Sequence, residues 1–230
     1  MTTSGTAAFD PSGGQIILYA YSMCGLRRTA LTQEHMEDAR MAMGLMLAGW
    51  GNSTPNLWTV DLVEVTLVAG TATYDVDAST VMILDAYIRT GTGDSQTDRI
   101  IWPVSRTEYA AFPNKTLEAP PTVFWFDRTL SPTITLWQVP DDTETYTLCY
   151  YRCTVVQDIS AANGQTVAVP QRWLDAFAWG LASRLAVSYA PDRAQALDAK
   201  AKEAVMEARA QDTEAVPVYL IPQLSGYYPR

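Results

Sequence analysis

The chain has 230 residues, 48% of them hydrophobic and 18% charged, and a formal net charge of −9 at pH 7. A chain of this length buries about 70% of its unfolded surface, so it does not need disulfide or metal cross-links to fold. The acidic charge argues against tight binding of nucleic acid, which depends mainly on Lys and Arg that neutralise phosphates. An acidic wall can still repel DNA and let it slide past.

Cysteine usage and hydropathy indicate a soluble protein made in a reducing compartment, the cytoplasm. Cys149 and Cys153 lie four residues apart in a strand pattern, about 13 Å by strand rise, which is too far for a mutual disulfide. We therefore expect these two and Cys24 to be small buried hydrophobic residues. No apolar run reaches the roughly 20 residues of a membrane span, and residues 1–10 lack the basic start of a signal peptide.

Two helices are predicted near the N-terminus. Apolar residues recur at helical spacing over 15–24, and Gly25 is suited to end that helix. A second helix is expected from an N-cap at Thr32 to Trp50, with acidic residues in its first turn where the helix dipole favours them. Gaps of three and four residues predict burial of one stripe against neighbouring helices: Met36, Ala39, Met43, Met46 and Trp50.

The period changes to that of β-structure after Pro55. Strands are predicted over 60–67, 81–89, 100–104 and 145–157, and a short segment at 74–76 is expected to pair back. The clearest hairpin joins 122–127 to 133–139. A polar loop at 91–98, a helical turn at 105–112 and an irregular stretch with prolines complete this region.

Helical spacing returns at Pro170, a residue suited to a first turn. Apolar residues step by four from Trp173 to Tyr189, and Pro191 then stops that helix and starts another, whose alanines allow a close approach between helices. Beyond Asp212 the tail contains three prolines and a glycine, so we do not expect it to be helical. Its apolar residues make it too hydrophobic for a simple disordered end.

These elements predict an α+β fold in three parts. Residues 1–57 and 157–212 are expected to form a discontinuous bundle of about four helices, the number needed to bury the apolar stripes. Residues 58–156 form an inserted, antiparallel β-rich domain. Residues 213–230 form an extended C-terminal arm.

No pattern in the sequence indicates catalysis, a cofactor or a metal site, so we expect that the chain is not an enzyme. The single histidine, His35, is interpreted as a solvated helix start, because no recognisable Ser or Cys nucleophile accompanies it. The pairs Asp141–Asp142 and Asp75–Asp77 resemble glycosidase carboxylates only superficially, since aspartate is common in turns. Residues 91–95 lack the lysine and the following helix of a phosphate loop.

Several segments, taken in order, resemble the head-to-tail adaptors of short-tailed bacteriophages, the tail accessory factor or tail tubular protein A-like family. The resemblance runs from about Leu31 to Tyr228 and rests on the order of the segments, because none is a catalytic signature and each alone is weak. They are LT at 31–32 with the Met-rich helix that follows, NLW at 56–58, ILDAYIR at 83–89, PVSRTEY at 103–109, PT at 121–122 with WFDR at 125–128, LWQVP at 136–140, YAP at 189–191 and GYY at 226–228. Relatives often have proline where Gln138 stands, which bears on a turn and not on the assignment.

The resemblance implies a structural virion protein of the tail or neck, assembled in the host cytoplasm as a ring of twelve copies beneath the dodecameric portal. Such a ring seals the portal, extends the channel through which genomic DNA passes without sequence-specific binding, and supports the tail nozzle and tail fibre proteins. The helical bundle would form the ring, and the β-rich domain would face the nozzle or fibres. The arm would order on binding to the portal. The residues expected to contact the portal are Val218, Tyr219, Ile221, Tyr227 and Tyr228.

Two other functions stay open at this point. Trp125, Phe126 and Trp137 favour a sheet core but would also suit a sugar-binding face, so one alternative is a carbohydrate-binding or depolymerising module of a phage tail. The other is a different ring of the tail, such as a stopper. A sugar-binding module has no use for an apolar C-terminal arm, which favours the adaptor.

Overall fold

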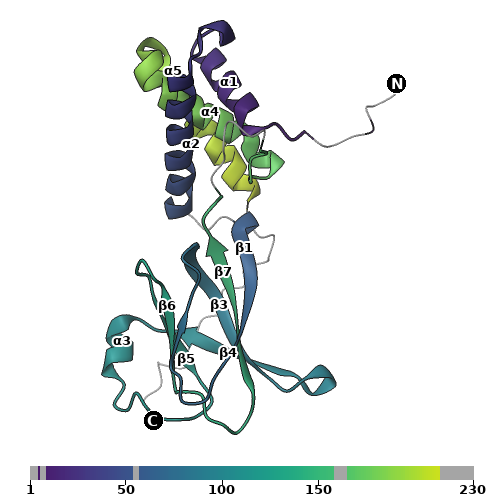
Figure 1. Ribbon diagram of the computed structural model, residues 1–230, viewed down its shortest axis with the longest axis vertical. Helices are drawn as coiled ribbons and strands as arrows, with labels where there is room; N and C mark the ends of the chain where they lie inside the picture. The colour runs from purple at the N-terminus through teal and green to yellow at the C-terminus, as the bar shows by residue number, and fades with distance from the viewer. Residues whose placement is uncertain (1–4, 6–8, 54–56, 158–164, 213–230) are drawn as a thin grey trace, which may run out of the picture.

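The computed structural model describes residue 5 and residues 9–53, 57–157 and 165–212. Within these ranges the chain has five α-helices and one seven-stranded sheet. Four of the helices gather at one end of an elongated molecule, and the curled sheet forms the other end (Figure 1). The prediction of a mixed α+β fold is therefore confirmed.

The helices form where the sequence carries their start and stop signals. Their bounds are Gly13–Met23 (α1), Gln33–Ser53 (α2), Arg106–Ala111 (α3), Gln171–Tyr189 (α4) and Pro191–Gln211 (α5). α1 begins at a capping box, in which the Ser12 hydroxyl accepts from the Gln15 backbone N–H and the Gln15 side chain accepts from that of Ser12. Pro191 takes the first position of α5, where its missing N–H costs nothing. Pro170 caps α4 from outside and is not part of its first turn.

α4 is the centre of the helical end, because it contacts α1, α2 and α5. The stripe predicted on α2 is confirmed as core: Ala39, Met43 and Met46 are buried, and Met36 and Trp50 pack against them partly buried. α5 packs on α4 through small side chains, as its alanine spacing predicts. Its buried residues are Leu197, Ala201, Ala204 and Ala208.

α2 and α5 both run antiparallel to α4. Tyr189 at the end of α4 donates a hydrogen bond to Asp38 near the start of α2, and Trp50 near the end of α2 packs on Trp173 near the start of α4. Arg172 at the start of α4 forms an ion pair with Asp212, which follows α5. α2 and α5 therefore point in the same direction.

The sheet has the strand order β1-β7-β3-β4-β5-β6-β2. The strands are Val60–Thr66 (β1), Thr73–Asp75 (β2), Thr80–Thr90 (β3), Thr97–Pro103 (β4), Val123–Asp127 (β5), Thr133–Trp137 (β6) and Tyr146–Thr154 (β7). The predicted hairpin is confirmed as the antiparallel pair β5 and β6. The expectation of a fully antiparallel region is wrong at one pair, because β4 and β5 are parallel. The connection between them contains α3 and is long enough to return the chain to the same end of the sheet.

The short segment predicted at 74–76 also differs from the expectation, because it does not pair back with the strand that precedes it in the chain. β2 pairs with β6, with Tyr74 opposite Ile134, and lies at the other end of the strand order from β1. The linker after β1 is attached to both sides of the curled sheet, since the Leu67 N–H donates to the Tyr146 carbonyl and the Leu136 N–H donates to that of Ala72. This linker carries the chain from one edge strand to the other, so no tight hairpin forms.

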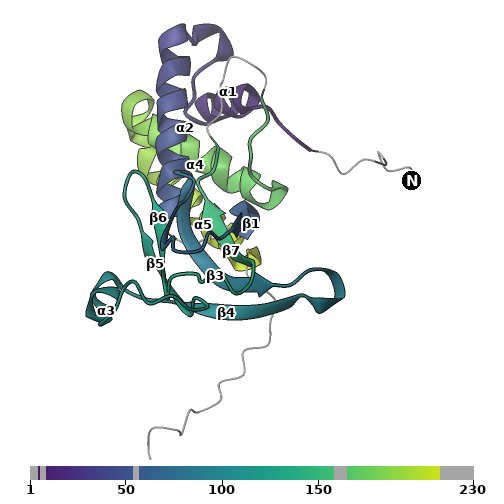
Figure 2. The same ribbon diagram turned by 60° about the horizontal axis from the view of Figure 1, so that its bottom comes forward.

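The sheet has a core of its own, separate from that of the helices. Its buried residues include Ile88, Ile101, Phe124, Leu136 and Leu148. α3 and the turn between β3 and β4 project on opposite sides of the sheet (Figure 2). All three cysteines are buried, as expected.

Candidate functional site

The residues predicted to contact the portal, Val218, Tyr219, Ile221, Tyr227 and Tyr228, lie outside the described residues. The structure does place the point at which the described chain ends. Asp212 follows α5, its side chain is 6% exposed, and it forms an ion pair with Arg172. The chain therefore reaches residue 213 from an anchored position.

This position lies at the junction between the helices and the sheet. Trp58, just before β1, packs on Trp173 of α4 with ring centroids 4.9 Å apart, and Trp50 of α2 packs on the same ring at 4.9 Å. Ala208 near the end of α5 belongs to the same apolar cluster. One cluster thus joins three helices to the start of the first strand, beside the end of the described chain.

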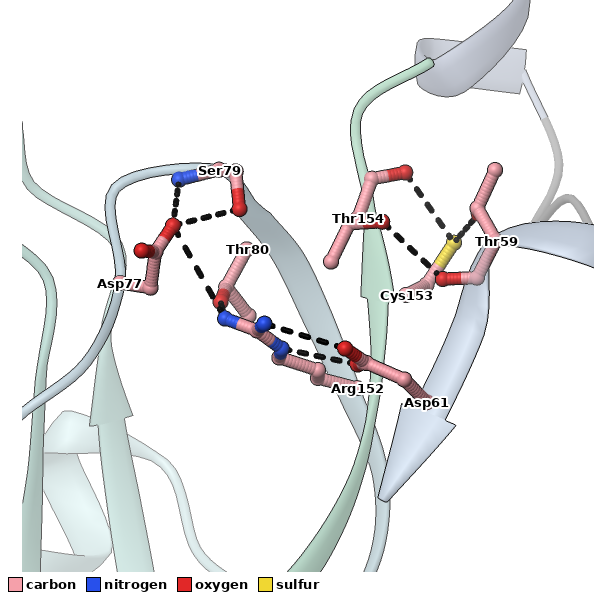
Figure 3. A network of polar contacts seen from close by, with 8 residues as sticks. All are labelled: Thr59, Asp61, Asp77, Ser79, Thr80, Arg152, Cys153 and Thr154. Carbon is pink, nitrogen blue, oxygen red and sulfur yellow. Dashed lines mark hydrogen bonds and ion pairs between the residues drawn. The ribbon is translucent and has the colours of Figure 1, made fainter. Parts of the chain in front are cut away.

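A polar network centred on Arg152 of β7 stabilises the end of the sheet that faces the helices (Figure 3). The Arg152 guanidinium donates two hydrogen bonds to Asp61 of β1, from Nε at 2.8 Å and from Nη2 at 3.1 Å. It donates a third to the Thr80 hydroxyl of β3 at 3.2 Å, and its Nη1 lies 3.8 Å from Asp77 Oδ1. Three neighbouring strands are held together by one cation.

The surrounding contacts of this network are local and satisfied. Asp77 accepts from the Ser79 backbone N–H at 2.8 Å and from its hydroxyl at 2.5 Å (Figure 3). These bonds, with the hydroxyl first, lower the pKa of the Asp77 carboxyl below its ordinary value. The Thr154 hydroxyl donates to the Thr59 carbonyl at 3.1 Å. The charges of this network are paired across neighbouring strands and form a structural clamp.

His35 lies in the first turn of α2, as expected, but its side chain is half-buried in an aromatic cluster and is not fully solvated. Its ring stacks on Tyr189 with centroids 4.8 Å apart, and its backbone carbonyl accepts from the Tyr21 hydroxyl at 2.5 Å. The Thr32 hydroxyl lies 2.7 Å from His35 Nδ1, just before α2 begins. Burial raises the pKa of Tyr21 well above its ordinary value. The cluster ties α1, α2 and α4 together.

Asp141 and residues 91–95, two of the other candidates for chemistry, have local structural roles. Asp141 accepts from the Thr143 and Tyr146 hydroxyls within one turn, which lowers the pKa of its carboxyl. Residues 91–95 form the turn between β3 and β4, where Gly91 and Gly93 adopt positive φ. In the part of the chain that the structure describes, no three His, Cys, Asp or Glu side chains gather into a metal site. No helix among the same residues has the length and apolar character of a membrane span.

α3 covers the aromatic residues that would suit a sugar-binding face. Phe112 stacks on Trp137 with centroids 4.2 Å apart, and Tyr109 packs on Trp125 at 5.5 Å. The Trp137 indole N–H donates to the Asn114 carbonyl at 2.8 Å. Phe126 packs against the sheet core. Intramolecular packing accounts for these rings, which weighs against the carbohydrate-binding alternative.

Two surface features of the helical end are absent from the sequence predictions. Met41 and Leu45 of α2 are 66% and 58% exposed. An open groove of about 610 Å³ lies between α2, α4 and α5. A helical wheel would have identified the exposed residues, because they lie opposite the predicted buried stripe. The groove depends on tertiary packing.

Comparison with known protein families finds a match to the SU10 adaptor protein over residues 36–220. The match begins in the first turn of α2 and includes the whole sheet, α4 and α5. A comparison with curated proteins gave no match. Because the family match covers more than half of the chain, and agrees with the resemblance to phage head-to-tail adaptors, the chain belongs to the SU10 adaptor protein family.

Proposed function

We propose that this chain is a structural virion protein, a head-to-tail adaptor between the portal and the tail nozzle or fibres. The observation that carries the proposal is the family match, which spans both the helices and the sheet. The charged residues of the Arg152 network support a structural role, because their side chains are used to join strands. In this proposal the protein is not an enzyme and needs no cofactor.

In the proposed assembly, twelve copies form a ring that seals the portal and extends the DNA channel. Residues 1–57 and 157–212 act as a bundle of four helices that forms the ring, and residues 58–156 face the nozzle or the fibres. The separate apolar cores of the helices and the sheet support this division. A net charge of −9 per copy favours passage of DNA without strong binding.

Residues 213–230 are proposed to be the portal-binding arm. Asp212 is fixed by Arg172, so the arm departs from a defined point at the junction. The proposed contact residues are Val218, Tyr219, Ile221, Tyr227 and Tyr228. Full burial of a large apolar side chain contributes about 1.5–3 kcal/mol, from which the cost of ordering the arm is subtracted.

Deletion of residues 216–230 tests the arm. The described helices and strands lie outside the deletion, so the far-UV circular dichroism is expected to stay that of a folded α+β protein. Affinity for the portal ring of the same phage, measured by surface plasmon resonance, is expected to fall by more than about 100-fold, since several apolar anchors are lost. Leu130→Ala is the control, because this side chain is 99% exposed in the turn between β5 and β6. Unchanged affinity of the deleted chain would reject the arm.

A further inference from the structure

The outward face of α2 carries a stripe that its own chain leaves exposed. Glu34, Glu37, Met41, Leu45 and Ala48 are all exposed and follow one another at gaps of three and four residues, so they share one face of the helix. The first two are acidic and the last three are apolar. The opposite face of α2 contributes to the helical core.

The groove lies on the other side of α2. Its floor is formed by Met46 and Trp50 of α2 and by Gly180 of α4. The missing side chain of Gly180 leaves room for Met46 at the base of the groove, because a Cβ at position 180 would lie 2.7 Å from the Met46 sulfur. Val205 and Met206 of α5 add an apolar wall, and Met206 is 71% exposed.

The rim of the groove is cationic, although the chain as a whole is acidic. Arg184, Lys202 and Arg209 border it, against one carboxylate from Asp198. Asp198 pairs with Lys202 at 2.6 Å. Arg184 is exposed and, within the ranges that the structure describes, forms no ion pair. The groove therefore suits a ligand that combines carboxylates with apolar side chains.

We propose that the stripe of α2 in one copy docks into the groove of a second copy, so that the partner of this surface is the chain itself. Two carboxylates would face the cationic rim, and Met41 and Leu45 would pack on Val205 and Met206. Because stripe and groove are different surfaces, the contact is heterologous and each copy uses both. Repeated, a heterologous contact gives a ring when its rotation closes and a filament when it does not. In taking the closed ring, the inference rests on the proposed adaptor function.

The direction of docking follows from rotational symmetry. Rotation about an axis along the helices makes all copies of α2 point the same way, and α2 is parallel to α5 within one chain. A docked α2 therefore lies parallel to α5 of the copy that holds the groove. In this direction the acidic start of the stripe comes beside Arg184, which borders the groove from α4, and its apolar residues come beside Val205 and Met206.

Disulfide trapping between two full-length variants tests the contact. Leu45→Cys and Met206→Cys are made in separate chains, whose native cysteines are buried. Both side chains are mostly exposed, so we expect both variants to fold. After mixing and mild oxidation, we expect more cross-linked heterodimer than from the control pair Leu45→Cys and Leu130→Cys, whose second cysteine lies in the turn between β5 and β6.

Charge reversal supplies a second readout. Glu37→Lys in the Leu45→Cys chain, or Arg184→Glu in the Met206→Cys chain, is expected to lower the cross-linking rate about tenfold, because like charges then face each other. Mixing the two charge-reversed chains is expected to restore the cross-linking rate, because opposite charges face each other again. Asp85→Lys is the control, since Asp85 is an exposed carboxylate on β3, away from both surfaces.

Cross-linking no better than with Leu130→Cys, or no response to charge reversal, overturns the proposal. Cross-linking that arises only after deletion of residues 216–230 assigns the groove to the chain's own arm and overturns it as well. Portal binding is measured on the same variants. If the variants bind the portal but do not cross-link, this contact is rejected and the adaptor function is kept. If they cross-link but do not bind the portal, the contact is supported and the adaptor function is rejected.

Discussion

At the residue scale, the fold depends on a few charged side chains that join distant parts of the chain. Arg152 bonds to Asp61 of β1 and Thr80 of β3, and its side chain is only 16% exposed. Arg89 similarly connects Glu64 of β1 with Asp98 of β4. A buried cation with several partners is costly to remove, because its carboxylates keep their charge and lose their hydrogen bonds.

Arg152→Leu is expected to destabilise the protein by about 1–2 kcal/mol. This is less than for a fully buried pair, because the Asp61 side chain is 51% exposed and water screens part of the loss. Lys200→Leu, which breaks the exposed pair with Glu203, should change the free energy of unfolding by less than about 0.5 kcal/mol. Urea unfolding of both variants measures the difference, and equal effects would contradict the clamp assigned to Arg152.

Ser79→Ala is expected to raise the pKa of Asp77 towards its ordinary value of 3.8, because the Ser79 hydroxyl is the main cause of the low value. A carboxyl with a lowered folded-state pKa stabilises the fold above its unfolded-state pKa, and this contribution is lost as the pH falls through the folded-state pKa. As the pH falls below about 4, the Ser79→Ala variant should therefore lose less of its free energy of unfolding than the unsubstituted protein does. NMR titration measures Asp77, with Asp141 as the internal control. An unchanged Asp77 pKa would refute the assignment.

At the scale of elements, α4 decides how the helices pack. It is the common neighbour of α1, α2 and α5, and Gly180 lets α2 approach it closely. Small residues at such crossings reduce the distance between helix axes, and the alanines of α5 serve the same purpose on the other side. The groove above Gly180 follows from this packing.

Two glycine substitutions are expected to change the stability of the fold in opposite directions. Gly180→Leu is expected to destabilise the protein by about 1–3 kcal/mol, since the new side chain meets Met46 and forces α2 away from α4. Gly44→Ala on α2 is expected to stabilise it by about 0.5–1 kcal/mol, because a Cβ there has nothing within 4 Å and alanine favours the helix. Thermal unfolding compares the two. Destabilisation by Gly44→Ala would contradict the packing described for α2.

Helices and single strands could be predicted because their signals are local. Pro191 marked the break between α4 and α5, and the capping pair Ser105 and Glu108 starts α3 within the predicted helical turn. The order of strands could not be predicted, since β7 lies between β1 and β3 through contacts distant in the sequence. The position of His35 depended in the same way on Tyr189, which comes from another helix.

At the scale of the whole molecule, two separate cores lie at the two ends of an elongated shape (Figure 1). The Trp50, Trp58 and Trp173 cluster joins them, and the described chain ends beside it at Asp212. In the proposed ring, the helices would contact neighbouring copies, the sheet would face the tail, and the arm would bind the portal. One chain would thus offer three kinds of contact from three parts of its fold.

Native mass spectrometry of the full chain mixed with the portal ring of its own phage tests the adaptor function most directly. We expect a complex of one portal ring with twelve added copies of the chain, and we expect deletion of residues 216–230 to abolish it. A folded chain that leaves the portal ring at its own mass would rule out the adaptor function.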